Sequence, residues 1–129
     1  MGKPVKAQIS LEFALFMGIS IVTFIIMYIA YLDQMQRLSL KREGILVDDL
    51  AATLQKELII AGKVSDGYYR QFSMPDTLDG IDYTVTRENI TIVVETSRQS
   101  AIRRIPPVIG DPVKGLNKIN KTGGVVYLN

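Results

Sequence analysis

The chain lacks the residues on which most active sites and metal centres depend. Its 129 residues include no cysteine and no histidine. Without cysteine there are no disulfides, no thiolate metal ligands and no thiol nucleophile, and without histidine the usual general base and the commonest metal ligand are missing. No set of carboxylates converges in the sequence to replace them. We therefore predict a protein that is not an enzyme and holds no cofactor and no metal.

Net charge is also small. Fifteen Lys and Arg against thirteen Asp and Glu give a formal charge of +2, and Lys3 and Lys6 at the N-terminus account for that excess. A neutral remainder carries no overall electrostatic footprint for nucleic acid, so we expect no nucleic-acid partner. The later cations could form a local basic patch, although solubility explains them more simply: Arg103, Arg104, Lys114, Lys118 and Lys121.

One long uncharged run dominates the N-terminal part of the chain. Residues 13–32 read FALFMGISIVTFIIMYIAYL, twenty residues without a charge. As a helix they would be ~30 Å long, about the thickness of the hydrocarbon core of a bilayer. Tyr28 and Tyr31 lie near the outer end, where tyrosine rings favour the headgroup level. The run predicts a transmembrane helix.

Two simpler explanations of this run are a cleaved secretory signal peptide and a plain signal anchor. The run is longer than a usual signal-peptide core, and the polar segment after it has no small-x-small cleavage site. Lys3 and Lys6 favour a cytoplasmic N-terminus, but Arg37, Lys41 and Arg42 follow the span, so charge alone does not fix the orientation. The signal anchor therefore stays open as an alternative.

Glu12 is an unusual residue for a plain anchor, because it lies at the very start of the apolar run. A carboxylate there is costly unless it has a partner. The segment around it, Lys6-Ala7-Gln8-Ile9-Ser10-Leu11-Glu12-Phe13, resembles the class III signal peptide of archaeal type IV pilins, with the Gln-x-Ser-x-Glu pattern at the leader junction. Archaellins usually lack this pattern, so the resemblance favours a pilus subunit.

The resemblance implies a processing and assembly route. A prepilin peptidase would cut between Ala7 and Gln8 on the cytoplasmic side, where Ala7 replaces the Gly of the bacterial pattern. Residues 1–7 would be the leader, carrying Lys3 and Lys6, and Glu12 would become the fifth residue of the mature chain. Its carboxylate, one helical turn from the new α-amino group of Gln8, could pair with that amine or a neighbour's and set the register between subunits.

The pattern changes after residue 32 to that of an amphipathic helix. Leu46, Leu50, Leu54 and Leu58 recur at every fourth position. Gly62 is a natural end, and Gly44 is a candidate bend. We predict a long helix over residues 8–61, transmembrane over 13–32 and amphipathic over 33–61.

Residues 62–129 read as a small β head outside the membrane. Two alternating segments, 81–86 and 90–95, predict a hairpin with a turn at 87–89. Further strands are expected over 68–74, 101–105 and 125–128, with a turn at Asp79-Gly80. The fold class is therefore α+β, a long N-terminal helix packed on a small antiparallel sheet, as in pilins.

Two Asn-x-Thr sequons begin at Asn89 and Asn120, both near expected turns or loops, and the resemblance implies glycosylation of at least one. A Ca²⁺ site from Asp76, Asp79 and Asp82 matches no EF-hand spacing, and turn chemistry explains these residues more simply.

The sequence leads to two hypotheses. In the first, the chain is a major or minor subunit of an archaeal type IV pilus, a single-pass membrane protein before assembly and part of an extracellular adhesive filament afterwards. Its partners would be itself and sister pilins, the peptidase, the assembly platform with its ATPase, and membrane lipid. In the second, it is a permanently anchored extracytoplasmic binding domain that never polymerises.

Overall fold

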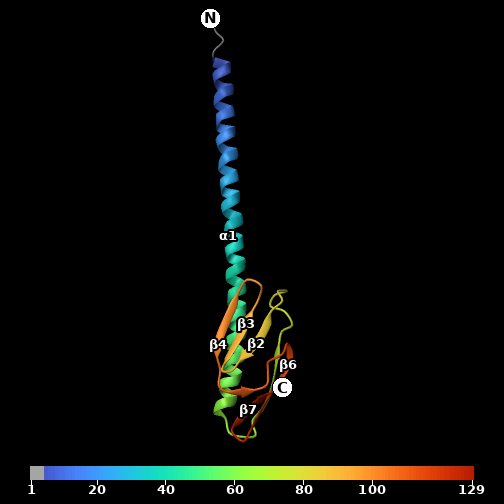
Figure 1. Ribbon diagram of the computed structural model, residues 1–129. Coiled ribbons are helices and arrows are strands. Elements are labelled where there is room, and N and C mark those ends of the chain that lie inside the picture. Colours follow the sequence, from blue (N-terminus) through green and yellow to red (C-terminus); the bar gives the residue numbers. More distant parts are fainter. Residues whose placement is uncertain (1–4) are drawn as a thin grey trace. The chain divides into compact units, whose positions relative to one another are not determined.

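The structure, a computed structural model, describes residues 5–129, and side chains from residue 9 onward. One long helix, α1 (Val5–Lys63), opens the chain and seven strands follow it (Figure 1). The described chain falls into two compact units that divide between Ser39 and Leu40. The predicted α+β class is confirmed.

The first unit, up to Ser39, is entirely helical where it is described. Its side chains from residue 9 onward are all exposed, including the large apolar ones. The helix is long and apolar enough to cross a membrane, with a mean hydropathy of 2.4 in its most apolar window. The coarse prediction of a helix that could span a bilayer is therefore confirmed.

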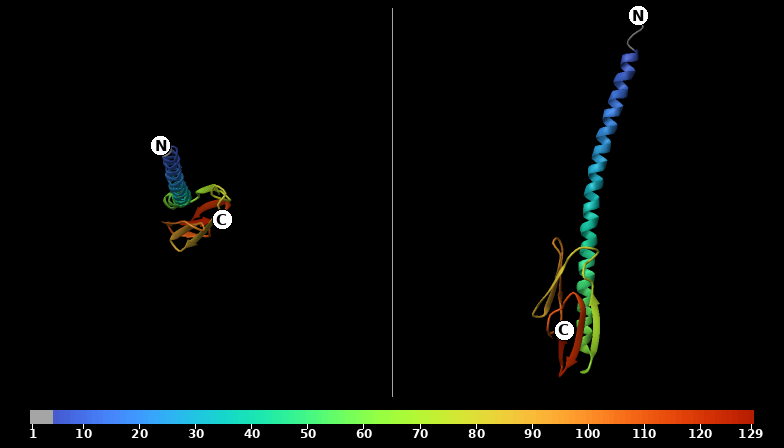
Figure 2. Two further views of the ribbon diagram at one scale, coloured as in Figure 1. Left: turned by 90° about the horizontal axis from the view of Figure 1, so that it is seen from above. Right: turned by 90° about the vertical axis from the view of Figure 1, so that its right-hand side faces the viewer.

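The second unit, Leu40–Asn129, packs one face of α1 on two small sheets (Figure 2). The residues of α1 that it buries follow one another at intervals of three and four: Glu43, Val47, Ala51, Leu54, Leu58 and Ala61. Leu46 and Leu50, from the predicted leucine row, are only partly buried. A strict repeat of four turns by about 40° at each step around a helix, so the row leaves the buried face and Val47 and Ala51 replace it.

The strands form two sheets within the described residues. In the first, β1 (Tyr69–Met74), β6 (Gly115–Thr122), β7 (Val125–Leu128) and β5 (Val108–Ile109) lie in that order. In the second, β2 (Thr84–Glu88), β3 (Thr91–Glu95) and β4 (Ser100–Arg104) lie in chain order. Neighbouring strands are antiparallel except β5 and β7, which are parallel. A single sheet was expected, so the head is more elaborate than the sequence indicates.

Two tight turns lie near their predicted places, although Arg87 and Glu88 of the predicted 87–89 turn belong to β2. Asp79 and Gly80 have φ of 53° and 80°, and the backbones of Leu78 and Ile81 exchange two hydrogen bonds of 2.9 Å around them. The β2–β3 hairpin turns at Asn89, which also has a positive φ of 54°. Short polar residues tolerate this left-handed conformation better than most, which explains Asp and Asn at these positions.

Both sheets share one core with α1. The buried hydrophobic side chains of the strands and their connections are mostly aliphatic, with one aromatic ring, and those that are almost completely buried include Tyr83, Ile92, Val94, Ile119 and Leu128. The opposite face of the first sheet is open to solvent and mixes aromatic, aliphatic and polar side chains: Tyr69, Gln71, Ser73, Leu116, Lys118, Asn120 and Tyr127.

Candidate functional site

The apolar half of α1 satisfies its own few polar groups. The hydroxyl of Ser20 donates to the Phe16 carbonyl and that of Thr23 to the Ile19 carbonyl, each at 2.8 Å. Such bonds leave no hydroxyl without an acceptor when the helix is surrounded by lipid or by other helices. The absent side chain of Gly18 leaves an apolar hollow of about 400 Å³ beside Leu15, Ile19 and Val22. Small residues of this kind let helix backbones approach each other closely in apolar surroundings.

The predicted processing residues lie at the beginning of this helix. Lys3 lies outside the described residues. Lys6, Ala7 and Gln8 belong to the first turns of α1, but their side chains also lie outside the described part of the chain. Glu12 is exposed on the helix, four residues after Gln8 and thus on the adjacent turn.

A buried carboxylate in the second unit was missed by sequence reasoning. Glu43 is only 1% exposed and faces the turn between β3 and β4. The Thr96 hydroxyl donates to its Oε1, and Nη2 of Arg98 lies 2.5 Å from its Oε2 as an ion pair. The missed signal is periodic, because position 43 is one turn before Val47 on the buried face. Glu43 thus ties the β3–β4 turn to the helix.

Gly44, the candidate bend, lies inside the helix beside the β3–β4 turn. The helix continues through it, and a Cβ atom there would lie 3.4 Å from Oε1 of Gln99 in the same turn. That distance is an ordinary van der Waals contact with the end of a flexible side chain, so it would also accommodate a larger residue than glycine.

Lys121 closes the other end of the helix. Its ammonium group is almost buried, at 9% exposure, and donates to the carbonyl oxygens of Gly62 (2.8 Å) and Val64 (2.7 Å). The last carbonyls of a helix have no partners within it and carry partial negative charge, so a cation there is favourable. α1 ends at Lys63, two residues beyond the predicted end at residue 61.

Most cations of the basic patch considered from the sequence are already bound to carboxylates or carbonyl oxygens. Arg103 pairs with Asp48 at 2.5 Å, Lys114 pairs with Asp82, and Lys121 is occupied at the helix end. Asp79 pairs with Arg42 at 2.8 Å. Two of the three aspartates of the considered Ca²⁺ site are thus bound to cations, and among the described side chains no group of three metal-binding residues comes together.

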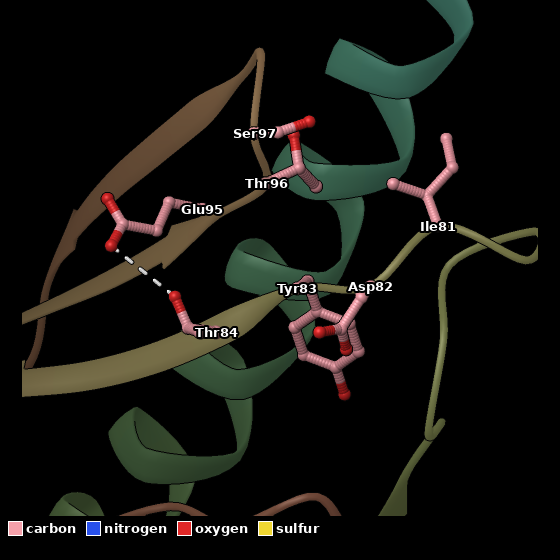
Figure 3. A pocket seen from close by; sticks show the side chains of 7 residues that line it. All are labelled: Ile81, Asp82, Tyr83, Thr84, Glu95, Thr96 and Ser97. Atoms are coloured by element: carbon pink, nitrogen blue, oxygen red, sulfur yellow. Dashed lines mark hydrogen bonds between the residues drawn. The ribbon is translucent and has the colours of Figure 1, made fainter.

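Tyr83 and Asp82 line a polar pocket of about 350 Å³ at the start of β2 and the end of β3 (Figure 3). The Thr84 hydroxyl donates to Glu95 across the strands at 3.3 Å, and the hydroxyl of Tyr83 donates to the Pro75 carbonyl. Burial raises the pKa of Tyr83, and the carboxylates of Asp76 and Asp82 act in the same direction. The hydrogen bond from Lys114 lowers the pKa of Asp82, and their charges add to this.

Hydroxyl and carboxylate groups of β2, β3 and the segments beside them line this pocket. Among the described side chains that line it, one hydrogen bond joins two of them, from the Thr84 hydroxyl to the Glu95 carboxylate. The Nζ atom of Lys114, which holds Asp82, lies 4.8 Å from the centre of the Tyr83 ring. The contacts among Asp82, Tyr83 and Lys114 hold the start of β2 in place.

The two sequons lie in different environments. Asn89 is exposed at the β2–β3 turn, as predicted. Asn120 is also exposed but lies within β6, opposite Tyr69 of β1 and Tyr127 of β7, so its expected place in a turn or loop is wrong. The polar residues of the 115–122 segment hid this strand, since its inward positions include Asn117 and Lys121.

Comparisons of the chain with protein-family models, curated proteins and solved structures found no match.

Proposed function

We propose that this chain is a structural subunit of an archaeal type IV pilus. The observation that carries the proposal is the first unit, an apolar helix whose side chains from residue 9 onward are exposed and which is continuous with the helix of a folded β head. Such a surface needs lipid or other helices around it. The Ala7-Gln8 junction and Glu12 favour a helix that lies first in lipid and later among other helices.

In this proposal the precursor is a single-pass membrane protein with a cytoplasmic N-terminus. A prepilin peptidase removes residues 1–7, and an ATPase-driven assembly platform moves the helix into a bundle with copies of itself or sister pilins. The filament serves surface attachment. The hydroxyls of Ser20 and Thr23 donate to carbonyls of their own helix. They therefore suit both surroundings, because neither lipid nor an apolar bundle supplies acceptors.

The decisive experiment is N-terminal sequencing of the protein from its native cells, followed by shearing of those cells. A mature chain that begins at Gln8 and leaves the cells with sheared filaments supports the pilin. A chain that begins at Met1 or Gly2 and stays with the membrane supports the permanent anchor instead.

Glu12 is the residue on which assembly depends in this proposal. Glu12→Gln should be processed normally but yield few filaments, because the neutral amide cannot pair with the α-amino group of Gln8. The matched control is Glu88→Gln, an exposed carboxylate at the end of β2, which should assemble normally. Normal filament yield from Glu12→Gln would remove the register role.

We also propose N-glycosylation on the extracytoplasmic head, first at Asn89. A transferase can reach an exposed turn residue without opening a sheet, whereas Asn120 is hydrogen-bonded into a strand with neighbours on both sides. The intact mass of wild-type protein from native filaments should exceed that of the polypeptide, and Asn89→Gln should lose the excess. A bare polypeptide mass in the wild type would refute the proposal.

A further inference from the structure

The C-terminal end of α1 borders an apolar hollow that no part of the proposed function uses. Its volume is about 480 Å³, and it is lined by Ile59, Gly62, Lys63, Arg104 and Pro106. The helix contributes the first three residues, and the end of β4 with the following segment contributes the others. Cavities of this size, mainly apolar with a few polar groups, are typical of binding sites.

Gly62 shapes the hollow by having no side chain. A Cβ atom at this position would lie 3.3 Å from Cγ and 3.4 Å from Cβ of Pro106. The proline ring and Ile59, which is 36% exposed, therefore provide apolar walls that remain open to solvent. A larger residue at position 62 would fill the space.

The two cations at the hollow, Lys63 and Arg104, take part in none of the ion pairs of the described chain. Most described Lys and Arg side chains have a carboxylate or carbonyl partner. Those of the described chain with neither a carboxylate nor a carbonyl partner are Lys41, Lys56, Lys63, Arg104 and Lys118. Lys63 and Arg104 line the hollow, and Lys56 lies two helical turns before Lys63.

The end of the helix does not use these charges. Lys121 already donates to the carbonyls of Gly62 and Val64, where a cation of the last turn would otherwise be favourable. Lys63 is exposed, and Arg104 offers its guanidinium to solvent while only its backbone carbonyl is bound, by the side-chain amide of Gln55 at 2.7 Å. Both cations are free to receive an external anion.

We propose that this hollow binds an acidic peptide segment of another protein. One aliphatic side chain of the segment enters between Ile59 and Pro106, and carboxylates on either side of it pair with Lys63 and Arg104. The guanidinium of Arg104 suits a carboxylate because it can donate two parallel hydrogen bonds. A concave site receives a protruding side chain, whereas a lipid surface is contacted by side chains that themselves protrude, so the shape favours a peptide. This inference holds whether or not the chain assembles into filaments.

The test uses the full chain in nanodiscs of zwitterionic lipid and three fluorescent peptides. The first contains Glu-Leu-Glu between glycines, the second Gln-Leu-Gln and the third Glu-Ser-Glu. Fluorescence anisotropy should show the first binding most tightly, with an affinity that falls as salt rises. Charge reversal by K63E with R104E should weaken it by about tenfold or more, since two exposed ion pairs become repulsions.

Two further variants separate the hollow from general charge. K118E reverses an unpaired lysine on the open face of the first sheet and should change the affinity less than about twofold. G62V should weaken binding of the Glu-Leu-Glu peptide by filling the hollow while leaving both cations in place. Equal binding of all three peptides, or equal effects of K118E and the K63E/R104E pair, would overturn the proposal.

Other occupants give distinct results in the same assay. Competition by phosphatidylserine vesicles that depends on Lys63 and Arg104 would assign the hollow to anionic lipid and overturn the peptide. Association between nanodiscs that the same charge reversal abolishes, without peptide binding, would assign it to a second copy of the chain.

Discussion

Lys121 joins β6 to the end of α1 through two hydrogen bonds from one buried ammonium group. Lys121→Met keeps a side chain of similar length but leaves the carbonyls of Gly62 and Val64 without these donors. We expect the free energy of unfolding to fall by about 2–3 kcal/mol, the usual cost of buried polar groups that lose a charged partner. Urea unfolding of the purified chain, followed by near-ultraviolet circular dichroism, measures this loss.

Lys118 provides the control, because it is in the same strand but points to the open face. Lys118→Met should change stability by less than about 0.5 kcal/mol. Equal losses in the two variants would show that the carbonyl contacts of Lys121 contribute little.

Tyr83 makes the stability of the second unit sensitive to alkaline pH. Burial raises the pKa of its hydroxyl, so the folded state holds this proton more tightly than the unfolded state does. The contribution is complete below the unfolded pKa of about 10 and is lost as pH rises toward the higher folded value. Thermal melts should therefore show wild type losing stability faster than Tyr83→Phe above about pH 10.

At neutral pH the order of these two proteins should differ. Wild type should be the more stable by about 1 kcal/mol, because only tyrosine can donate to the Pro75 carbonyl. Parallel pH profiles of the two proteins would mean that Tyr83 titrates equally in both states.

At the scale of elements, Gly110 sets how closely β5 approaches β7. Its φ is +104°, and a Cβ atom there would lie 1.8 Å from the carbonyl oxygen of Leu128. Its own carbonyl accepts a hydrogen bond of 2.6 Å from Nε of Arg87 in β2, which links the two sheets. Gly110→Ala should therefore cost more than about 3 kcal/mol of stability, since the backbones must separate.

Gly67→Ala separates backbone strain from this collision. Gly67 has a similar φ of +91°, but nothing lies within 4 Å of a Cβ built there. Its cost should stay near about 1 kcal/mol in the same unfolding measurement. Comparable losses at positions 67 and 110 would make φ, and not the contact with Leu128, the cause.

The sequence predicts the elements whose pattern is strong. The helix, β1, the β2–β3 hairpin, β4 and β7 lie within a few residues of their expected places, because periodicity and turn residues are local properties. β6 escaped notice because Asn117 and Lys121 occupy inward positions that are normally apolar. Those residues are satisfied by tertiary partners, Asn117 by the backbone of Val113 and Lys121 by the helix end, and neither partner is visible locally.

The same limit applies to the candidate sites. The leader junction and Glu12 are linear motifs, so sequence alone finds them. The contact of Glu43 with Thr96 and the hollow between Gly62 and Pro106 each join residues about forty to fifty positions apart in the chain. Only the folded arrangement brings them together.

At the scale of the whole molecule, the proposed membrane insertion would depend on the uncharged centre of the apolar run. Ile21→Arg should cost insertion about 2.5–3.5 kcal/mol, because a guanidinium would lie near the bilayer centre. Carbonate extraction of expressing cells should move part of this variant from the membrane pellet to the supernatant.

Ile45 allows the same substitution elsewhere on α1. It is exposed, at 52% against 55% for Ile21, but belongs to the second unit. Ile45→Arg should stay in the pellet. Full retention of Ile21→Arg would contradict the assignment of residues 13–32 as the span.

The absence of cysteine makes the open face of the first sheet useful for microscopy. Ser73 is exposed on β1, and its replacement by cysteine changes a single atom. That thiol would be the only one in the chain. If the chain assembles as proposed, a maleimide dye applied to living cells would mark each subunit once, so that individual filaments could be followed in real time.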